Sequence, residues 1–202
     1  QNTMYFLGDN NDYACGGAIY MKAKLASFKV TESVFKENEA GNGGAIYYTC
    51  DSSSESKSSG KLLEIVDNDF ALQINDCRFL SNVGYNNGGA IHISITKGEP
   101  PKPIDISDCI FMKNTCKDED IDFPQEKPEY GGAIYYSLDF SSSSSSSKSL
   151  LDIADINYVF RVFDCSFFQN EVNYRGGAVY ISIEKGEPSK PIEIEKCTFD
   201  NN

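Results

Sequence analysis

Apolar and polar residues alternate along many short stretches of the chain. Residues 104–107 read Ile-Asp-Ile-Ser, and residues 192–195 repeat the pattern as Ile-Glu-Ile-Glu. Alternation with a period of two is typical of β-strands, because successive side chains point to opposite faces. No 11-residue window shows helical periodicity bounded by caps. The sequence therefore predicts an all-β chain of short strands.

Two short motifs alternate strictly along these strands, and each occurs five times. The first motif is Phe-x-x-Asn, and its residues are Phe35 with Asn38, Phe79 with Asn82, Phe111 with Asn114, Phe167 with Asn170 and Phe199 with Asn202. The second motif is Gly-Gly-Ala followed by Ile or Val, and its glycines are Gly16 and Gly17, Gly43 and Gly44, Gly88 and Gly89, Gly131 and Gly132, and Gly176 and Gly177. Motifs that recur in phase indicate a solenoid of stacked units.

A longer period overlies the two motifs. The segment that begins at Gly88 returns 88 residues later at Gly176. We therefore predict a single domain in which residues 1–15 are a loop that completes a neighbouring coil. Residues 16–42 form a short coil. Residues 43–130 and 131–202 are two copies of an 88-residue double coil, of which the second is incomplete.

We expect these units to form a right-handed parallel β-helix of about five coils with long loop insertions. Stacking at the ~4.8 Å spacing of paired strands gives each inward residue an identical neighbour above and below. The phenylalanines should then form an internal aromatic stack. The asparagines should sit at a corner, where the left-handed conformation is tolerated and their amides bond to neighbouring coils. The glycine pairs should allow a tight bend that a Cβ would block.

Seven cysteines lack the CxxC pairs of a zinc site. Four lie two positions before a motif phenylalanine and, with Ser33, should line the interior wall: Cys77, Cys109, Cys165 and Cys197. Free thiols that behave as small apolar side chains are one interpretation. Disulfides between adjacent coils are the other. We expect Cys15, Cys50 and Cys116 in turns or loops, where they are candidates for oxidation.

The net charge of −12 excludes a nucleic-acid partner, since phosphate binding needs a basic face. No apolar run approaches the ~20 residues that span a bilayer, so no membrane insertion is expected. The acidic loops Asp9–Asp12 and Asp118–Asp122 lack EF-hand spacing, and we expect neither a metal nor a cofactor. The serine tracts at 52–59 and 141–147 are predicted to be flexible insertions that could carry O-linked glycans.

Catalytic chemistry has little support in the sequence. The one histidine, His92, is matched by Tyr180 in the second copy, which favours an outward or tolerant position over a catalytic one. The only arginines are Arg78, Arg161 and Arg175, and no carboxylate pair stands out from the repeats. We therefore predict no catalytic residues. A β-helix that degrades acidic polysaccharides is the enzymatic alternative.

The alternation of Phe-x-x-Asn with Gly-Gly-Ala-Ile resembles the repeats of the polymorphic outer membrane protein family, known from chlamydial surface autotransporters. The resemblance extends from Cys15 to Asn202. It implies an extracellular or cell-surface β-helix implicated in adhesion, with host or cell-surface glycans as partners. The 88-residue period and the serine tracts are particular to this chain.

The two ends of the sequence are complementary. The chain stops on a Phe-x-x-Asn motif and starts with a loop that leads to Gly16, and 15 residues would separate Asn202 from the Gly16 of a following copy. We therefore expect a structural protein that forms a head-to-tail homopolymer, as separate subunits or as segments of one long chain. A monomeric adhesin passenger domain is the alternative, and a cut at an arbitrary point of a repeat array would explain the same ends.

Overall fold

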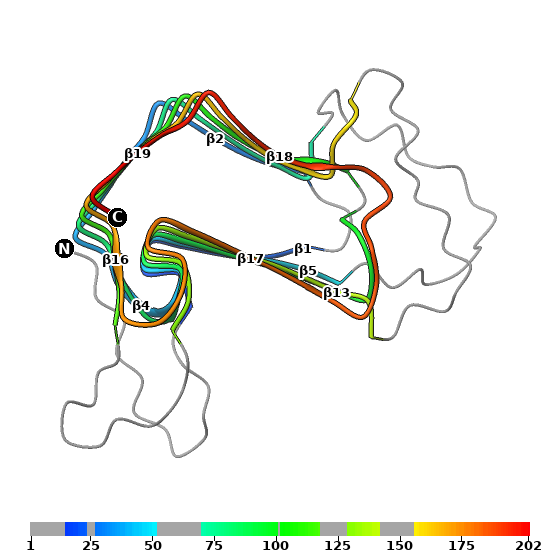
Figure 1. Cartoon of the computed structure of the whole chain (residues 1–202), viewed down its shortest axis with the longest axis horizontal. Coiled ribbons are helices and arrows are strands. Elements are labelled where there is room, and N and C mark those ends of the chain that lie inside the picture. Colours follow the sequence, from blue (N-terminus) through cyan, green and yellow to red (C-terminus); the bar gives the residue numbers. More distant parts are fainter. Residues whose placement is uncertain (1–14, 24–26, 52–69, 101, 118–128, 142–155) are drawn as a thin grey trace, which may run out of the picture.

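The computed structural model describes residues 15–23, 27–51, 70–100, 102–117, 129–141 and 156–202 as a stack of coils. Each coil begins at a glycine pair and runs through up to four short strands before the next pair. Figure 1, viewed along the stack, shows the strands of successive coils lying over one another. The predicted parallel β-helix is confirmed, because every strand pairing is parallel and joins neighbouring coils.

Four parallel sheets make up the walls of the β-helix. The first sheet contains β1 (Ile19–Ala23), β5 (Ile46–Asp51), β9 (Ile91–Thr96), β13 (Ile134–Asp139) and β17 (Val179–Glu184). The second contains β2 (Phe28–Thr31), β6 (Leu72–Asn75), β10 (Ile104–Ser107), β14 (Phe160–Phe163) and β18 (Ile192–Glu195). The third contains β3 (Val34–Lys36), β7 (Arg78–Leu80), β11 (Ile110–Met112), β15 (Ser166–Phe168) and β19 (Thr198–Asp200). The fourth contains β4 (Glu39–Asn42), β8 (Val83–Asn87), β12 (Thr115–Cys116) and β16 (Glu171–Val172).

The core lies between the first and second sheets, which face each other across the interior (Figure 1). Alternate residues of each strand face this core, as the sequence pattern predicts. In β5, Ile46, Tyr48 and Cys50 are fully buried, and the residues between them are partly exposed. The rings of Tyr136 in β13 and Phe160 in β14 stack across the interior at 4.1 Å. The aliphatic and aromatic residues of every coil therefore merge into one continuous core.

Several predictions concern residues outside the described part of the chain. The loop of residues 1–14, the acidic stretches at 9–12 and 118–122, and nearly all of both serine tracts lie there. Within the described ranges no helix is long and apolar enough to cross a bilayer. The same ranges contain no group of three or more His, Cys, Asp or Glu side chains that could hold a metal ion.

Candidate functional site

The motif phenylalanines form one internal column, which we call the Phe stack. Each lies in a three-residue strand of the third sheet, in register with the phenylalanine of the next coil. Neighbouring ring centroids are 4.8–4.9 Å apart and the planes differ by at most 7°. Phe79, Phe111 and Phe167 are fully buried, whereas Phe199 in the last coil is 49% exposed. The column is thus a continuous piece of core that opens at one end.

The motif asparagines form a second column, which we call the Asn ladder. The side-chain amide of each donates to the Oδ1 atom of the asparagine in the next coil, at distances of 2.7–2.9 Å from Asn38 through to Asn202. The backbone N–H of each donates to the same Oδ1 atom. The second amide hydrogen reaches the carbonyl of the phenylalanine one coil back, as from Asn114 to Phe79. Every buried polar group of an internal rung is paired, and the bonds between asparagines all run from one coil to the next in the same direction.

One detail of the sequence prediction for this corner is wrong. The left-handed residue is not the asparagine but the residue before it, and φ lies between 52° and 55° at all five of these positions. That residue makes the bend, which leaves the asparagine free to aim both its N–H and its amide at the neighbouring coil. The left-handed positions therefore carry Glu, Ser, Lys, Gln and Asn, which face outward.

The glycine pairs form the next corner, at the other end of the short fourth sheet. The first glycine of each pair has a φ of 61–72°, which side chains rarely adopt. A Cβ on the second glycine would lie 2.0–2.3 Å from the carbonyl oxygen of the glycine in the next coil at Gly17, Gly44, Gly89 and Gly132. The following alanines are buried at 0–6% exposure from Ala45 to Ala178. This corner tolerates no larger residue because coils approach there backbone to backbone.

The cysteines form no disulfide, and all seven lie in the described part of the chain. Cys77, Cys109 and Cys165 are buried in a column behind the Phe stack, and Cys197 continues it in the last coil. Each thiol contacts the carbonyl oxygen two residues earlier, at 3.0–3.3 Å. Ser33 occupies the same place in the first coil and donates to Thr31 at 2.7 Å.

Two of the remaining cysteines differ from the prediction. Cys50 lies in β5 and Cys116 in β12, so both are fully buried in strands and not in turns or loops. Burial raises the pKa of Cys50 to about 11 and that of Cys116 to about 12. Both groups are therefore protonated thiols at neutral pH, which makes them poor targets for oxidation. The alternating β-pattern of residues 46–51 could have indicated this for Cys50.

Aromatic rings also form a ladder on the outward face of the first sheet, which we call the outer ring ladder. Its members are Tyr20, Tyr47, His92, Tyr135 and Tyr180. His92 lies between Tyr47 at 4.8 Å and Tyr135 at 4.6 Å. It points outward as its match with Tyr180 suggests, yet it is covered and only 6% exposed. Burial lowers its pKa to about 3, so the imidazole is neutral at pH 7.

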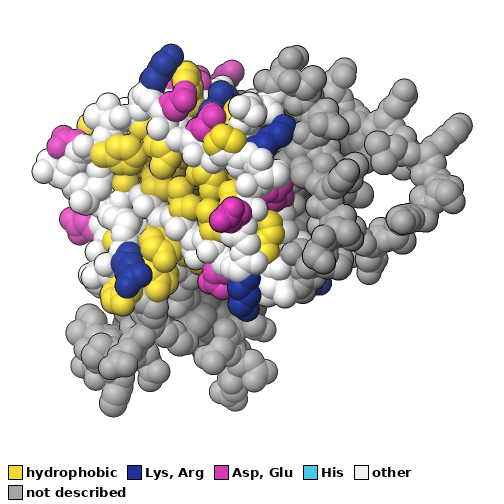
Figure 2. Space-filling model, turned by 45° about the vertical axis from the view of Figure 1, so that its right-hand side comes forward, with side chains coloured by type: hydrophobic (Ala, Val, Ile, Leu, Met, Phe, Trp, Pro, Cys, Tyr) yellow, Lys and Arg dark blue, Asp and Glu magenta, His cyan; other side chains and the backbone are white. Residues whose placement is uncertain are grey.

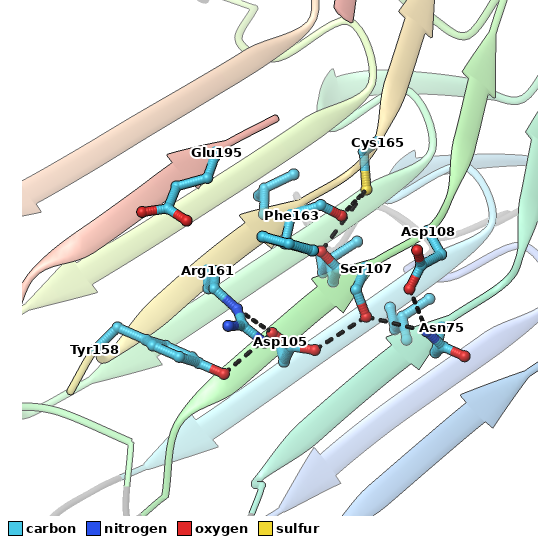
Figure 3. A network of polar contacts seen from close by, with 12 residues as sticks. Asn75, Asp105, Ser107, Asp108, Tyr158, Arg161, Phe163, Cys165 and Glu195 are labelled. Atoms are coloured by element: carbon cyan, nitrogen blue, oxygen red, sulfur yellow. Dashed lines mark hydrogen bonds and ion pairs between the residues drawn. The ribbon is translucent and has the colours of Figure 1, made fainter. Parts of the chain in front are cut away.

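A polar network covers the outward face of the second sheet (Figure 3). The carboxylate of Asp105 in β10 is 2% exposed and accepts hydrogen bonds from Arg161 at 2.7 Å, Tyr158 at 3.1 Å and Ser107 at 3.1 Å. The Arg161 guanidinium stacks over the Tyr158 ring at 4.4 Å. Asp105 is thus held by three donors and covered from solvent, as expected of a structural carboxylate. The network ties the third coil to the fourth.

The end formed by the fifth coil exposes the core. Ile183 and Ile194 are each 41% exposed there, although they continue columns that are buried in the coils below. Figure 2 shows hydrophobic side chains gathered on the end of the stack and bordered by charged ones. A shallow groove at the outer corner beside it is lined by polar residues, Lys113, Thr115, Gln169, Glu171 and Asn201. The exposed apolar end is the strongest candidate for a binding surface.

Comparisons with known proteins match only part of the chain. No curated protein and no solved structure is similar to it at a significant level. A family model does match residues 32–49, which run from the end of β2 through Asn38 and the glycine pair into β5. These residues are similar to the Chlamydia polymorphic membrane protein repeat, so one Phe-x-x-Asn to Gly-Gly-Ala-Ile unit of the β-helix is of the kind found in that surface-protein family.

Proposed function

We propose that this chain is a non-enzymatic, surface-exposed structural protein and one period of an extended β-helical fibre. The β-helix would continue from the fifth coil of one copy into the first coil of the next. The next copy is either a second molecule or a following segment of the same polypeptide. The similarity of residues 32–49 to a membrane-protein repeat supports a place at the cell surface.

The observation that carries this proposal is the open Asn ladder. At each internal rung an asparagine donates its N–H and one amide hydrogen to the following coil. In Asn202 these two donors have no following rung among the described residues. At the other end, no described residue donates to Oδ1 of Asn38. A further coil that carries an asparagine in register would accept both of these hydrogen bonds, as Asn202 accepts those of Asn170.

Apolar surface supports the same arrangement. Continuing the register by one rung beyond the fifth coil would cover Phe199 and Ile194, as their internal counterparts Phe167 and Val162 are covered. The exposed ring of Phe199 would then gain the 4.8 Å stacking of its internal counterparts. Burial of such side chains stabilises by about 1.5–3 kcal/mol each. Open parallel edges and exposed core at the same surface are the features that template further coils.

Electron microscopy and sedimentation of the purified 202-residue chain test the proposal. Filaments should appear with rising concentration and carry an axial repeat of about 24 Å, from five coils at ~4.8 Å. A direct fusion of two copies, Asn202 to Gln1, should give a rod twice as long by small-angle X-ray scattering. Dispersed monomers at high concentration, together with a fusion that behaves as two independent bodies, would refute the proposal.

A monomeric surface adhesin is the second candidate, and a cell-surface location, which the similarity of residues 32–49 to a membrane-protein repeat supports, would suit it equally. Under this alternative the side walls bind a partner and the end stays uncovered. A glycan-binding screen on the dispersed protein separates the two functions. Binding without filaments supports the adhesin, and filaments without binding support the fibre.

A further inference from the structure

We infer that the outer ring ladder is a site of oxidative tyrosine coupling, at which the rings of stacked tyrosines become joined by carbon–carbon bonds. One link joins Tyr20 to Tyr47, and a second joins Tyr180 to a ring that stacks on it, Tyr135 or Tyr130. The co-reactant is hydrogen peroxide, used by a haem peroxidase that oxidises phenols one electron at a time. The site lies on a side wall of the β-helix, so the inference does not depend on the proposed fibre.

Two stretches of the ladder hold tyrosine rings face to face. Tyr20 in β1 and Tyr47 in β5 are in register, and their ring centroids lie 5.3 Å apart with planes 2° from parallel. Tyr135 in β13 and Tyr180 in β17 repeat this arrangement at 5.6 Å and 12°. In-register side chains leave equivalent backbone positions one coil apart. The ring carbons ortho to the two hydroxyl groups, which are the atoms that couple, are therefore close neighbours in each pair.

Tyr130, just before the glycine pair of the fourth coil, adds a ring to the second stretch. It stacks on Tyr180 with centroids 4.3 Å apart and planes 25° apart, and it lies 6.1 Å from Tyr135. Tyr174 instead meets Tyr130 edge-on, at 5.8 Å and 78°. Tyr180 thus has two stacked partners of the right chemistry, whereas the contact of Tyr174 with Tyr130 is perpendicular.

His92 separates the two stretches. Its imidazole lies between Tyr47 and Tyr135, with centroid distances of 4.8 and 4.6 Å. An imidazole has no carbon ortho to a phenolic hydroxyl, so it cannot take part in this coupling. The ladder should therefore give two separate links, one on each side of His92, and not a continuous chain of linked rings.

The rings of both stretches are accessible from outside. Tyr20 is 55% exposed, and Tyr47, Tyr135 and Tyr180 are partly exposed. An oxidant can therefore take an electron from these rings, and the open side leaves them room to tilt toward each other as the bond forms. Tyr48, which points into the core from the same strand as Tyr47, is fully buried and out of reach.

The reaction conserves atoms and electrons. Each phenol of a pair loses one electron and its hydroxyl proton, which gives two tyrosyl radicals. The radicals form one carbon–carbon bond between ortho positions, and the hydrogens on these two carbons then move to the oxygens, which restores both aromatic rings. The peroxide accepts the two electrons and two protons and becomes two water molecules. Each link thus makes the chain lighter by two hydrogen atoms.

A link of this kind joins neighbouring coils covalently along the axis. Without it, the coils are held to each other by hydrogen bonds and packing. A cross-link that closes a loop of chain stabilises the folded state mainly by restricting the unfolded one. We expect the linked chain to unfold at a temperature higher by about 5 °C or more.

Peroxidase treatment of the dilute, folded chain tests the inference. With hydrogen peroxide, monomeric chains should gain dityrosine fluorescence and lose two hydrogens per link. Tandem mass spectrometry of peptides should locate the links at Tyr20 with Tyr47 and at Tyr180. The yield per chain should not change with protein concentration, because both partners belong to one molecule. Mainly intermolecular links, or links scattered over other tyrosines, would overturn the inference.

Phenylalanine variants separate stacking from exposure, because they keep the ring and remove only the hydroxyl. In the chain with Tyr20→Phe and Tyr180→Phe the intramolecular yield should fall about fivefold or more, since proximity of the partners drives the coupling. Tyr174→Phe is the matched control, as Tyr174 is 56% exposed but meets its neighbour edge-on. An unchanged yield in the double variant, or an equal loss in Tyr174→Phe, would refute a role for stacking. His92→Tyr should add links between the two stretches.

Discussion

The Phe–Asn corner and the outer ring ladder are both columns of side chains that repeat once per coil, yet they differ in how much variation they contain. The corner has Phe and Asn in all five coils. The outer ring ladder replaces one of its tyrosines with His92. In the corner, each side chain must fill a closed interior or meet backbone donors of two coils at fixed positions. On the outer face any planar ring can stack, so the identity of the residue matters less.

Removing a ring from the Phe stack should have the largest effect. Phe111 is fully buried between Phe79 and Phe167. Phe111→Ala should lower the free energy of unfolding by about 4 kcal/mol, because it leaves a cavity in the core. Chemical denaturation measures this, and Tyr135→Ala in the outer ring ladder is the matched control. A similar loss in both variants would show that the two columns do not differ as described.

Cutting the Asn ladder should cost somewhat less. Asn114→Ala removes one acceptor and two amide donors, and it leaves the buried N–H and amide of Asn82 without their partner. We expect a loss of about 3 kcal/mol, since each buried group left unpaired costs about 1–3 kcal/mol. Asn75→Ala, which removes partly exposed hydrogen bonds to Ser107 and Asp108, should cost about 1 kcal/mol. Equal losses in the two variants would contradict the importance of burial.

His92, the one residue of the outer ring ladder that is not a tyrosine, should make the free energy of unfolding depend on pH. His92 has a folded pKa of about 3 against about 6.5 when unfolded, so the unfolded state binds more protons below pH 6.5. The part of the free energy of unfolding that depends on neutral His92 is fully present above pH 6.5 and is lost as the pH falls toward 3. Between pH 7 and pH 5 the free energy of unfolding should fall by about 2 kcal/mol more in the unchanged chain than in the His92→Tyr variant. Parallel stability curves for the two proteins over this range would refute the assignment.

The smallest effect should come from making the cysteine column uniform. Ser33 already occupies the site of a thiol and bonds to the carbonyl two residues earlier, as the cysteines do. Ser33→Cys should therefore change the free energy of unfolding by no more than about 0.5 kcal/mol. Thermal unfolding under reducing conditions measures it. A large gain would mean that contact between thiols stabilises the column more than the shared backbone bond does.

Much of the fold could be predicted because the signal is repeated. A single Phe-x-x-Asn or Gly-Gly-Ala says little, but five of each in phase fix the number of coils and the neighbours of every motif residue. Inward and outward positions follow from the alternation, as in β5. The positions of the phenylalanines and glycines in the structure reflect constraints that act on each coil alike.

The features that the sequence did not reveal depend on what surrounds a coil. His92 is buried by the neighbouring rings of Tyr47 and Tyr135 and by the backbone of Asn87, and the sequence of β9 alone does not indicate this. Cys116 lies in a strand of two residues, too short to show alternation. The shift of the left-handed bend to the residue before each asparagine follows from hydrogen-bond directions between coils.

The parallel stacking also determines how such a rod responds to force. All four sheets place their hydrogen bonds along the axis, so no covalent bond lies directly in line with tension between the two ends. Tension applied to the two ends acts on the hydrogen bonds between neighbouring coils, and it separates the coils at one interface at a time. Each coil released, such as the 45 residues 43–87, would lengthen the chain by roughly 150 Å. A surface fibre of this design would absorb mechanical energy one coil at a time and shorten again as the coils restack.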